Sequence, residues 1–247
     1  MFRVLVGNNC STIYSSIATV SIHNYWPGGT STDWNTASNW SDNKIPDGSC
    51  PNVRIPGGTP HQPLINSGTV LVQNLQIDAN ATLTVAGATL QVSGSLTNQG
   101  NVDATTGTLE FNGSSQQTVT SGSNIPVKNL LISNTDPTGV TLAGPVDVYT
   151  SVDFANAGKT LNANGNLTIK STETETAWVG DMTNHTINGD VTVERYINIG
   201  PGKHGKAWEF VTAPVTGVSV KNGWMEGGTS TASTGFGTQI TGPGAPA

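Results

Sequence analysis

The chain has 247 residues, which is long enough for one or two domains with a buried core. Apolar residues make up 35% and charged residues only 11%, less than half of the usual share of about 25%, and Gly, Ser, Thr and Asn fill the difference. The net charge of -6 comes without a basic stretch, which argues against nucleic acid as a partner. No run reaches the roughly 20 apolar residues of a membrane span. This composition does not fit a helical protein and is typical of an extracellular one.

Residues 1–24 are expected to belong to a β module. Residues 3–6 and 17–22 have apolar strand patterns separated by turn-forming residues, which predicts a hairpin. The N-terminus lacks the apolar core of about 7 to 15 residues that a signal peptide needs. The segment 1–22 resembles the last two strands of the immunoglobulin-like modules repeated in bacterial surface proteins. That resemblance implies that the chain is a fragment of a longer protein.

The chain has two cysteines, Cys10 and Cys50, too few for a disulfide framework or for a zinc site built from four cysteines. Three states stay open for Cys10. It forms a disulfide with a residue upstream of this chain, as the module resemblance implies, or it is a free thiol, or it pairs with Cys50.

Residues 25–66 combine three tryptophans with turn-forming residues and a short strand at 53–55. We expect this segment to cap the end of a solenoid, whose terminal rung would otherwise expose apolar surface and unpaired strand edges. The segment resembles the entry that precedes right-handed parallel β-helices in large secreted proteins of the Bacteroidetes type, although the usual form has Asp where this chain has Cys50. The resemblance rests on Trp34, Asn39-Trp40, Pro46, Asn52-x-x-Ile55-Pro56 and Gln62-Pro63. The predicted cap residues are Trp26, Trp34, Trp40, Pro46 and Ile55.

The same segment contains side-chain oxygens that could serve Ca²⁺. Their spacing is not that of an EF-hand, and the nine-residue Gly-Asp repeat of Ca²⁺-binding β-rolls is missing from the sequence. We therefore interpret these residues as turn and cap formers and predict no metal site. They are Asp33, Asn35, Asn39, Asp42, Asn43 and Asp47.

From residue 67 to 194, short strands with apolar residues at spacing two recur every six to ten residues. Strands this short bury an apolar face only by stacking on the next turn, which predicts an all-β parallel β-helix, or solenoid. A sandwich of repeated hairpins remains the alternative, and the right-handedness comes from the resemblance alone. The predicted stacking core is Leu75, Ile77, Leu83, Val85, Leu90, Val92, Leu130, Ile132, Val140, Leu142, Val146 and Val148.

An internal repeat of the strand pattern supports this interpretation. It aligns the strand at Asn74 with that at Asn129, Leu83 with Val140, and Leu90 with Val146. Asparagines also recur near strand ends, where they either stack as amide ladders or serve as left-handed turn residues, the interpretation favoured for any single one. These are Asn74, Asn80, Asn98, Asn101, Asn129, Asn134, Asn162, Asn164 and Asn166.

Residues 195–247 are rich in Gly and Pro and are expected to begin a following β module or linker. They resemble the junction after the β-helix in the same surface proteins. The resemblance rests on Arg195-Tyr196, Trp208, Thr212-Ala213-Pro214-Val215 and the stretch 237–244.

No constellation of residues predicts a catalytic site or a cofactor site. The histidines His23, His61, His185 and His204 lack metal-ligand spacing, and nucleophile-elbow and P-loop motifs are absent from the sequence. Polysaccharide cleavage, which some β-helices perform, needs grouped carboxylates. Those of the predicted helix are scattered, although the spacing of Asp147 and Asp153 allows them to lie on successive strands. The carboxylates are Asp78, Asp103, Glu110, Asp147, Asp153, Glu173 and Glu175. Ice binding would need Thr-x-Thr at each turn, and the sequence has it only irregularly.

The chain is thus predicted to be a non-catalytic, extracellular β-helical segment of a bacterial surface protein, acting as a stiff spacer or adhesin stalk. Its resemblance implies export by the type IX route. The expected partner is a host or environmental surface. One alternative is a filament subunit that assembles with copies of itself by β-strand complementation. A second is a protein that binds or cleaves polysaccharide.

Overall fold

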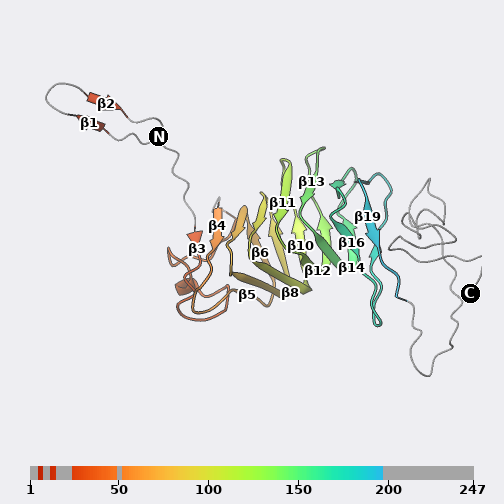
Figure 1. Ribbon diagram of the computed structural model, residues 1–247, viewed down its shortest axis with the longest axis horizontal. Helices are drawn as coiled ribbons and strands as arrows, with labels where there is room; N and C mark the ends of the chain where they lie inside the picture. The colour runs from red at the N-terminus through yellow and green to blue at the C-terminus, as the bar shows by residue number, and fades with distance from the viewer. Residues whose placement is uncertain (1–4, 8–11, 15–23, 49–51, 197–247) are drawn as a thin grey trace, which may run out of the picture. The chain divides into compact units, whose positions relative to one another are not determined.

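The computed structural model describes residues 5–7, 12–14, 24–48 and 52–196. The chain is all-β, and parallel sheets wind it into a solenoid of about seven turns (Figure 1). In the described part, the only helical element is the single 3-10 turn Ala37–Asn39. The predicted fold class is therefore confirmed, and the sandwich alternative is wrong because the strands of both sheets pair in parallel between turns.

Each turn of the solenoid contributes to two sheets. The eight-stranded sheet contains β3 (Asn24–Tyr25), β4 (Asn52–Ile55), β7 (Asn74–Ile77), β9 (Leu96–Asn98), β11 (Gln117–Ser121), β13 (Val140–Ala143), β15 (Thr160–Asn162) and β18 (Thr186–Asn188). The nine-stranded sheet contains β5 (Leu64–Ile65), β6 (Thr69–Val72), β8 (Thr82–Val92), β10 (Asn101–Phe111), β12 (Ile125–Ile132), β14 (Val146–Phe154), β16 (Leu167–Ile169), β17 (Trp178–Val179) and β19 (Val191–Val193).

The long strands of the nine-stranded sheet bend in their middle. The pairing register of β10 with β12 shifts between Ala104 and Thr108, and that of β12 with β14 shifts between Val127 and Asn129. Such irregularities bend a strand. At the two ends of the sheet the two halves are separate strands, since β5 and β6 both pair with β8, and β16 and β17 both pair with β14. Each rung therefore has three sides.

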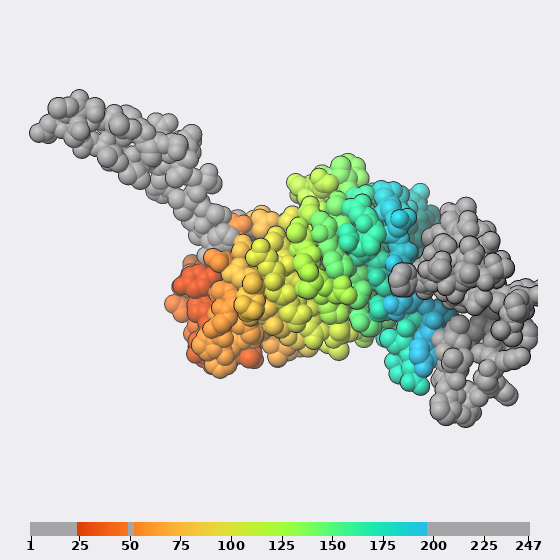
Figure 2. All heavy atoms as spheres, in the orientation of Figure 1, coloured from red at the N-terminus to blue at the C-terminus, as the bar shows by residue number. Residues whose placement is uncertain are grey.

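Alternation along each strand builds the core. One residue points into the solenoid and the next points out, as the burial pattern of β8 shows. All twelve residues of the predicted stacking core are at most 2% exposed, and they form one cluster that runs through the rungs. Figure 2 shows successive segments of the chain as successive bands along the solenoid. Each rung thus contributes apolar side chains that the neighbouring rungs help to cover.

The internal repeat of the sequence is not a structural repeat. Hydrogen-bonded side chains on neighbouring rungs are separated by 21 positions in Thr108–Asn129 and by 26 in Asn162–Asn188. The two copies of the sequence repeat, such as Asn74 and Asn129, lie more than twice as far apart in the chain as two residues on neighbouring rungs. This separation does not correspond to a whole number of rungs. The repeat relates Asn74 of the eight-stranded sheet to Asn129 of the nine-stranded sheet. The similarity arises because inward-facing strand patterns recur on every side of the solenoid.

The N-terminal hairpin differs from the predicted one. The structure pairs β1 (Leu5–Gly7) with β2 (Thr12–Tyr14) in antiparallel fashion, so Leu5 and Val6 of the expected first strand have a partner nearer in the chain, while residues 17–22 lie outside the described residues. A nearer partner strand closes a shorter loop, which costs less conformational entropy. Cys10, Cys50 and residues 197–247 lie outside the described residues, so the cysteine states and the C-terminal module stay predictions.

The boundary at residue 66 also stays a prediction. Strands β4 and β5 of the expected cap segment pair directly with β7 and β8, so the ladder continues across this position.

We predict that Gly100→Ala destabilises the protein by about 1–3 kcal/mol, because overpacking a tight site costs this much. A Cβ at position 100 would lie 2.4 Å from the backbone oxygens of both Asp78 and Ala81 on the preceding rung. Gly122→Ala is the matched control, since a Cβ there meets nothing within 4 Å. Urea unfolding should give a lower midpoint for Gly100→Ala only. Equal midpoints for the two variants would show that this close approach does not constrain the stack.

Candidate functional site

Three tryptophans form a buried cluster at the N-terminal end of the solenoid. Trp26, Trp34 and Trp40 are at most 2% exposed. Trp40 meets the other two edge-to-face, with ring centroids 4.6 Å from Trp34 and 5.0 Å from Trp26, while Trp26 and Trp34 are stacked at 6.3 Å. Such pairs add to the free energy of area burial. The cluster is therefore a compact apolar plug built by a segment with little regular structure.

Backbone hydrogen bonds join this cluster to the first rung. The Trp26 amide donates to the Arg54 carbonyl at 3.0 Å, and the Trp34 amide donates to the Leu64 carbonyl at 3.1 Å. The segment thereby meets both sheets and satisfies part of the strand edge that the first rung would otherwise leave open. Pro46 and Ile55 are also buried. All five predicted cap residues thus lie in the interior, which is where a capping role requires them.

Asn39 organises the loop of the plug. It is fully buried, and its Oδ1 accepts from the amides of Thr30 (3.0 Å) and Ser31 (2.9 Å) while its Nδ2 donates to the Asp33 carbonyl (2.9 Å). Two more calcium candidates have local roles, because Asp33 Oδ1 accepts from the Asn35 amide and Asp42 Oδ1 accepts from the Lys44 amide. Among the described residues, no three His, Cys, Asp or Glu side chains gather as a metal site would require.

A second polar cluster is buried at the corner between β10 and β11. Gln117 is fully buried, and its Nε2 donates to the carbonyls of Val92 (2.8 Å) and Gly94 (2.5 Å). Its Oε1 accepts from the Gly113 amide (2.8 Å) and from Asn134 Nδ2 (2.7 Å). One side chain therefore connects three successive rungs. Sequence reasoning missed Gln117, because it differs from its exposed neighbour Gln116 only in its burial, which the residue type does not reveal.

Both interpretations of the asparagines hold, at different positions. Asn80 and Asn164 have φ values of 62° and 52°, so they serve as left-handed turn residues. Others stack between rungs, since Asn74 Nδ2 donates to Asn52 Oδ1 (3.3 Å) and Asn188 Nδ2 donates to Asn162 Oδ1 (2.9 Å). We call the outward column to which these four belong the polar ladder. The ladder is Asn52, Asn74, Ser95, Thr118, Thr141, Asn162 and Asn188, from β4 to β18.

The carboxylates of the solenoid are engaged one by one with local partners. Asp78 forms an ion pair with Arg54 (2.7 Å), and the hydrogen bond within this pair raises the pKa of Arg54. Glu110 accepts from Gln91 Nε2 and Ser133 Oγ, and Glu175 accepts from Thr150 Oγ1.

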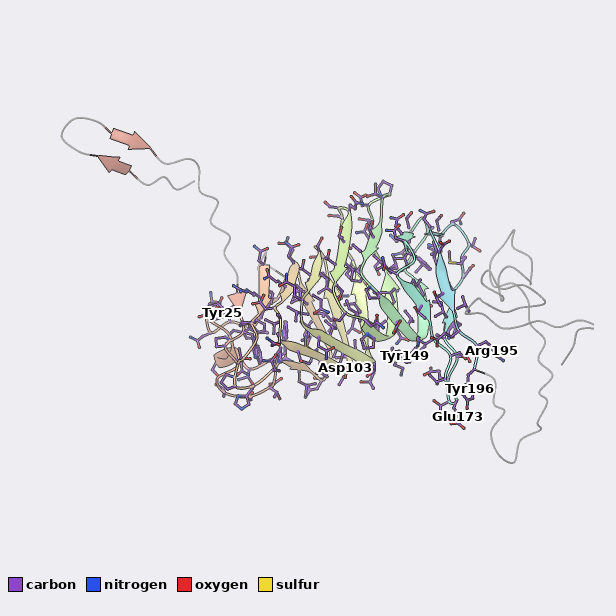
Figure 3. All side chains as sticks on the ribbon, viewed as in Figure 1. Tyr25, Asp103, Tyr149, Glu173, Arg195 and Tyr196 are labelled. Carbon is purple, nitrogen blue, oxygen red and sulfur yellow. The ribbon has the colours of Figure 1, made fainter. Side chains whose placement is uncertain are left out.

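Two of the carboxylates do not lie where the sequence suggested. Asp147 and Asp153 lie on one strand, β14, and not on successive strands, because β14 continues through the bend. Figure 3 shows Asp103 and Glu173 on one side of the solenoid but well apart. Asp147 and Asp153 are thus not placed opposite one another on neighbouring strands.

Further ionisable groups are held by their own neighbours. Lys170 Nζ donates a hydrogen bond to Glu194 Oε1 at 2.5 Å, and this bond raises the pKa of Lys170. Hydroxyl hydrogen bonds from Thr138 and Thr183 lower the pKa values of Asp136 and Asp181. The ring of His185 stacks on Phe154 at 4.9 Å, and His61 Nδ1 lies 2.8 Å from the Gly28 carbonyl. His23 and His204 lie outside the described residues. These contacts lie within turns and corners of the solenoid.

Two family models match parts of the chain. Residues 25–114 match a domain of unknown function, DUF8693, and residues 141–177 match the haemagglutinin repeat. No curated protein and no solved structure matches the chain. In the part that the structure describes, no helix is long and apolar enough to cross a membrane. The solenoid and the repeat together fit the adhesin-like β-helix that the resemblance implied, whereas the bacterial group and the export route stay predictions.

We expect Trp34→Ala to lower the free energy of unfolding by about 3–5 kcal/mol, the usual cost of removing a fully buried Trp or Phe side chain. Tyr25→Ala, one residue before Trp26, removes an aromatic side chain that is 48% exposed and should cost far less. Chemical denaturation of both variants measures the difference. Similar losses of unfolding free energy in the two variants would show that the tryptophan cluster does not stabilise the first rung.

Neighbouring glutamines provide a test of the buried corner. Gln117→Leu removes four hydrogen bonds and leaves the Gly113 amide without its acceptor, which should cost about 2–5 kcal/mol because each buried polar group left unsatisfied costs ~1–3 kcal/mol. Gln116→Leu, at an exposed position, should change stability by less than about 0.5 kcal/mol. Thermal unfolding of the two variants measures this difference. A Gln117→Leu variant as stable as the parent would contradict the stabilising role of the buried Gln117 cluster.

Proposed function

We propose that this chain is a non-catalytic, stiff spacer segment of an adhesin-like protein on a bacterial cell surface. The observation that carries the proposal is the unbroken parallel ladder from β4 to β18 in one sheet and from β5 to β19 in the other, closed over a single apolar core. The haemagglutinin repeat at residues 141–177 lies within this ladder and supports the adhesive context and the surface location. Export by the type IX route is part of the proposal and rests on the resemblance described above.

Stiffness follows from the direction of the hydrogen bonds. In a solenoid the backbone bonds between rungs run along the axis, so bending the axis lengthens many of them together. The polar ladder and Gln117 add side-chain bonds in the same direction. The core is continuous across rungs, so no rung slides without exposing its neighbours. Rotation or hinge motion within the stack is therefore costly.

The absence of catalysis is also a proposal, supported by the placement of the carboxylates. Asp78 is neutralised by Arg54, and Glu110 is held by Gln91 and Ser133. Asp147 and Asp153 lie on one strand, and Asp153 Oδ2 is held by Ser151 Oγ at 2.6 Å. An acid and a base would need to face one bond together.

Removing one rung tests the spacer role. Deleting residues 96–118 joins Ser95 to Val119, and Val119 then takes the place of Leu96, its register partner. Because each rung contacts only its neighbours, we expect the shortened full chain to fold with the β circular dichroism of the parent. Its contour length in single-molecule pulling should fall by the length of the deleted segment.

A matched deletion is the control. Deleting residues 96–107 removes about half a rung and shifts the inward faces out of register, so this variant should not fold. A full-rung deletion that fails to fold would contradict a modular spacer. Filament assembly stays a prediction.

A further inference from the structure

One outward column of the nine-stranded sheet ends in an exposed aromatic side chain. Register pairs join its six residues from β6 to β17. The residue that follows each of the first five members is buried, whereas Lys128, directly before Asn129, is exposed. Five of the six carry uncharged hydrogen-bonding groups, and the last, Trp178, has an indole that is 53% exposed. The column is Thr69, Thr89, Thr108, Asn129, Ser151 and Trp178.

The polar end of this column is held in place before any ligand arrives. Asn129 Nδ2 donates to Thr108 Oγ1 at 3.3 Å, and Ser151 Oγ lies 3.0 Å from Asn129 Oδ1. Ser151 is the register partner of Trp178 and is itself 3% exposed. Side chains fixed in this way lose little conformational entropy on binding.

A carboxylate lies beside the exposed indole. Ser151 Oγ is 2.6 Å from Asp153 Oδ2, which orients the carboxylate. Two residues after Trp178, the chain has Gly180, and a Cβ there would lie 2.7 Å from Asp153 Oδ1. Any other residue at position 180 would therefore press against this oxygen. Glycine leaves it open next to the ring, and Oδ1 accepts no hydrogen bond from the described residues.

We propose that this column binds an uncharged polysaccharide in an extended conformation. The C–H face of one sugar stacks on the Trp178 indole, as apolar sugar faces do on aromatic rings, and its hydroxyls donate to Asp153. Further sugars lie along Asn129 and the threonines, because strands neighbour one another at about 4.8 Å, a separation similar to the rise of an extended sugar chain. Asp153 and Glu110 flank the column and outweigh the single positive charge of Lys128 beside Asn129, so net like-charge repulsion disfavours polyanions.

This inference rests on the proposed adhesive function and gives it a partner. The exposed ring of Trp178 directly follows the haemagglutinin-repeat match, which ends at residue 177. The site requires no catalytic pair, since binding needs only the ring, the carboxylate and the fixed polar groups.

Affinity electrophoresis of the full chain tests the proposal. The gels contain hydroxyethyl cellulose, galactomannan or dextran as uncharged probes and polygalacturonate as the acidic comparison. We expect at least one uncharged polymer to retard the chain, and polygalacturonate not to. Trp178→Ala should weaken that retardation at least tenfold, Trp178→Phe should retain part of it, and Asp153→Asn should weaken it too. Tyr25→Ala, which removes an exposed ring from the other end of the solenoid, should migrate like the parent.

Several outcomes would overturn the inference. They are retardation by polygalacturonate alone, no retardation by any uncharged probe, or equal retardation of the parent and Trp178→Ala with both folded by circular dichroism. None of these results affects the rung-deletion test, which examines the spacer role without a ligand. Failure of the glycan site and failure of the spacer are thus separately visible.

Discussion

The structure depends on one constraint: even its longest strands, β8 and β10, cannot bury their apolar faces by themselves. Every inward side chain needs the rung before and the rung after to cover it, so the core exists only as a stack. Backbone pairing imposes the same condition, because each strand finds its hydrogen-bond partners on neighbouring rungs. The requirement explains the continuous core and the tight glycines at the corners. It also explains why the first rung needs the three indoles of Trp26, Trp34 and Trp40 against it.

Short alternating strands at regular intervals predicted the solenoid but left a sandwich of hairpins open, because a spacing of two specifies which face points inward whatever the partner. This pattern was not enough to predict the register. The motif Asn-Leu-x-Ile at residues 74 and 129 suggested one repeat, yet the two copies lie in different sheets, since all sides of a rung face the same apolar interior. The rungs also differ in length. Because all sides of a rung have the same alternating pattern, the sequence does not show at which residue each rung begins.

The candidate sites were predicted unevenly for a related reason. The buried tryptophans were recognised because aromatic residues are rare in this sequence and three of its six Trp lie within residues 26–40. Gln117 was not recognised, since it differs from Gln116 in burial and not in residue type. The outward column that ends at Trp178 was equally hidden, because its members come from six strands spread over much of the chain. Only the register brings them into line.

The hairpin-like loop between β16 and β17 shows how such a surface diversifies. Ser171 and Thr176 bridge across it, and the residues between them extend outward while β16 and β17 both stay paired with β14 (Figure 1). Extra length at a corner therefore leaves the stack untouched, since the strands on either side keep their partners. Natural selection can lengthen, shorten or recharge these corners one at a time. The same backbone can thus present a new exterior in each lineage while its interior remains almost unchanged.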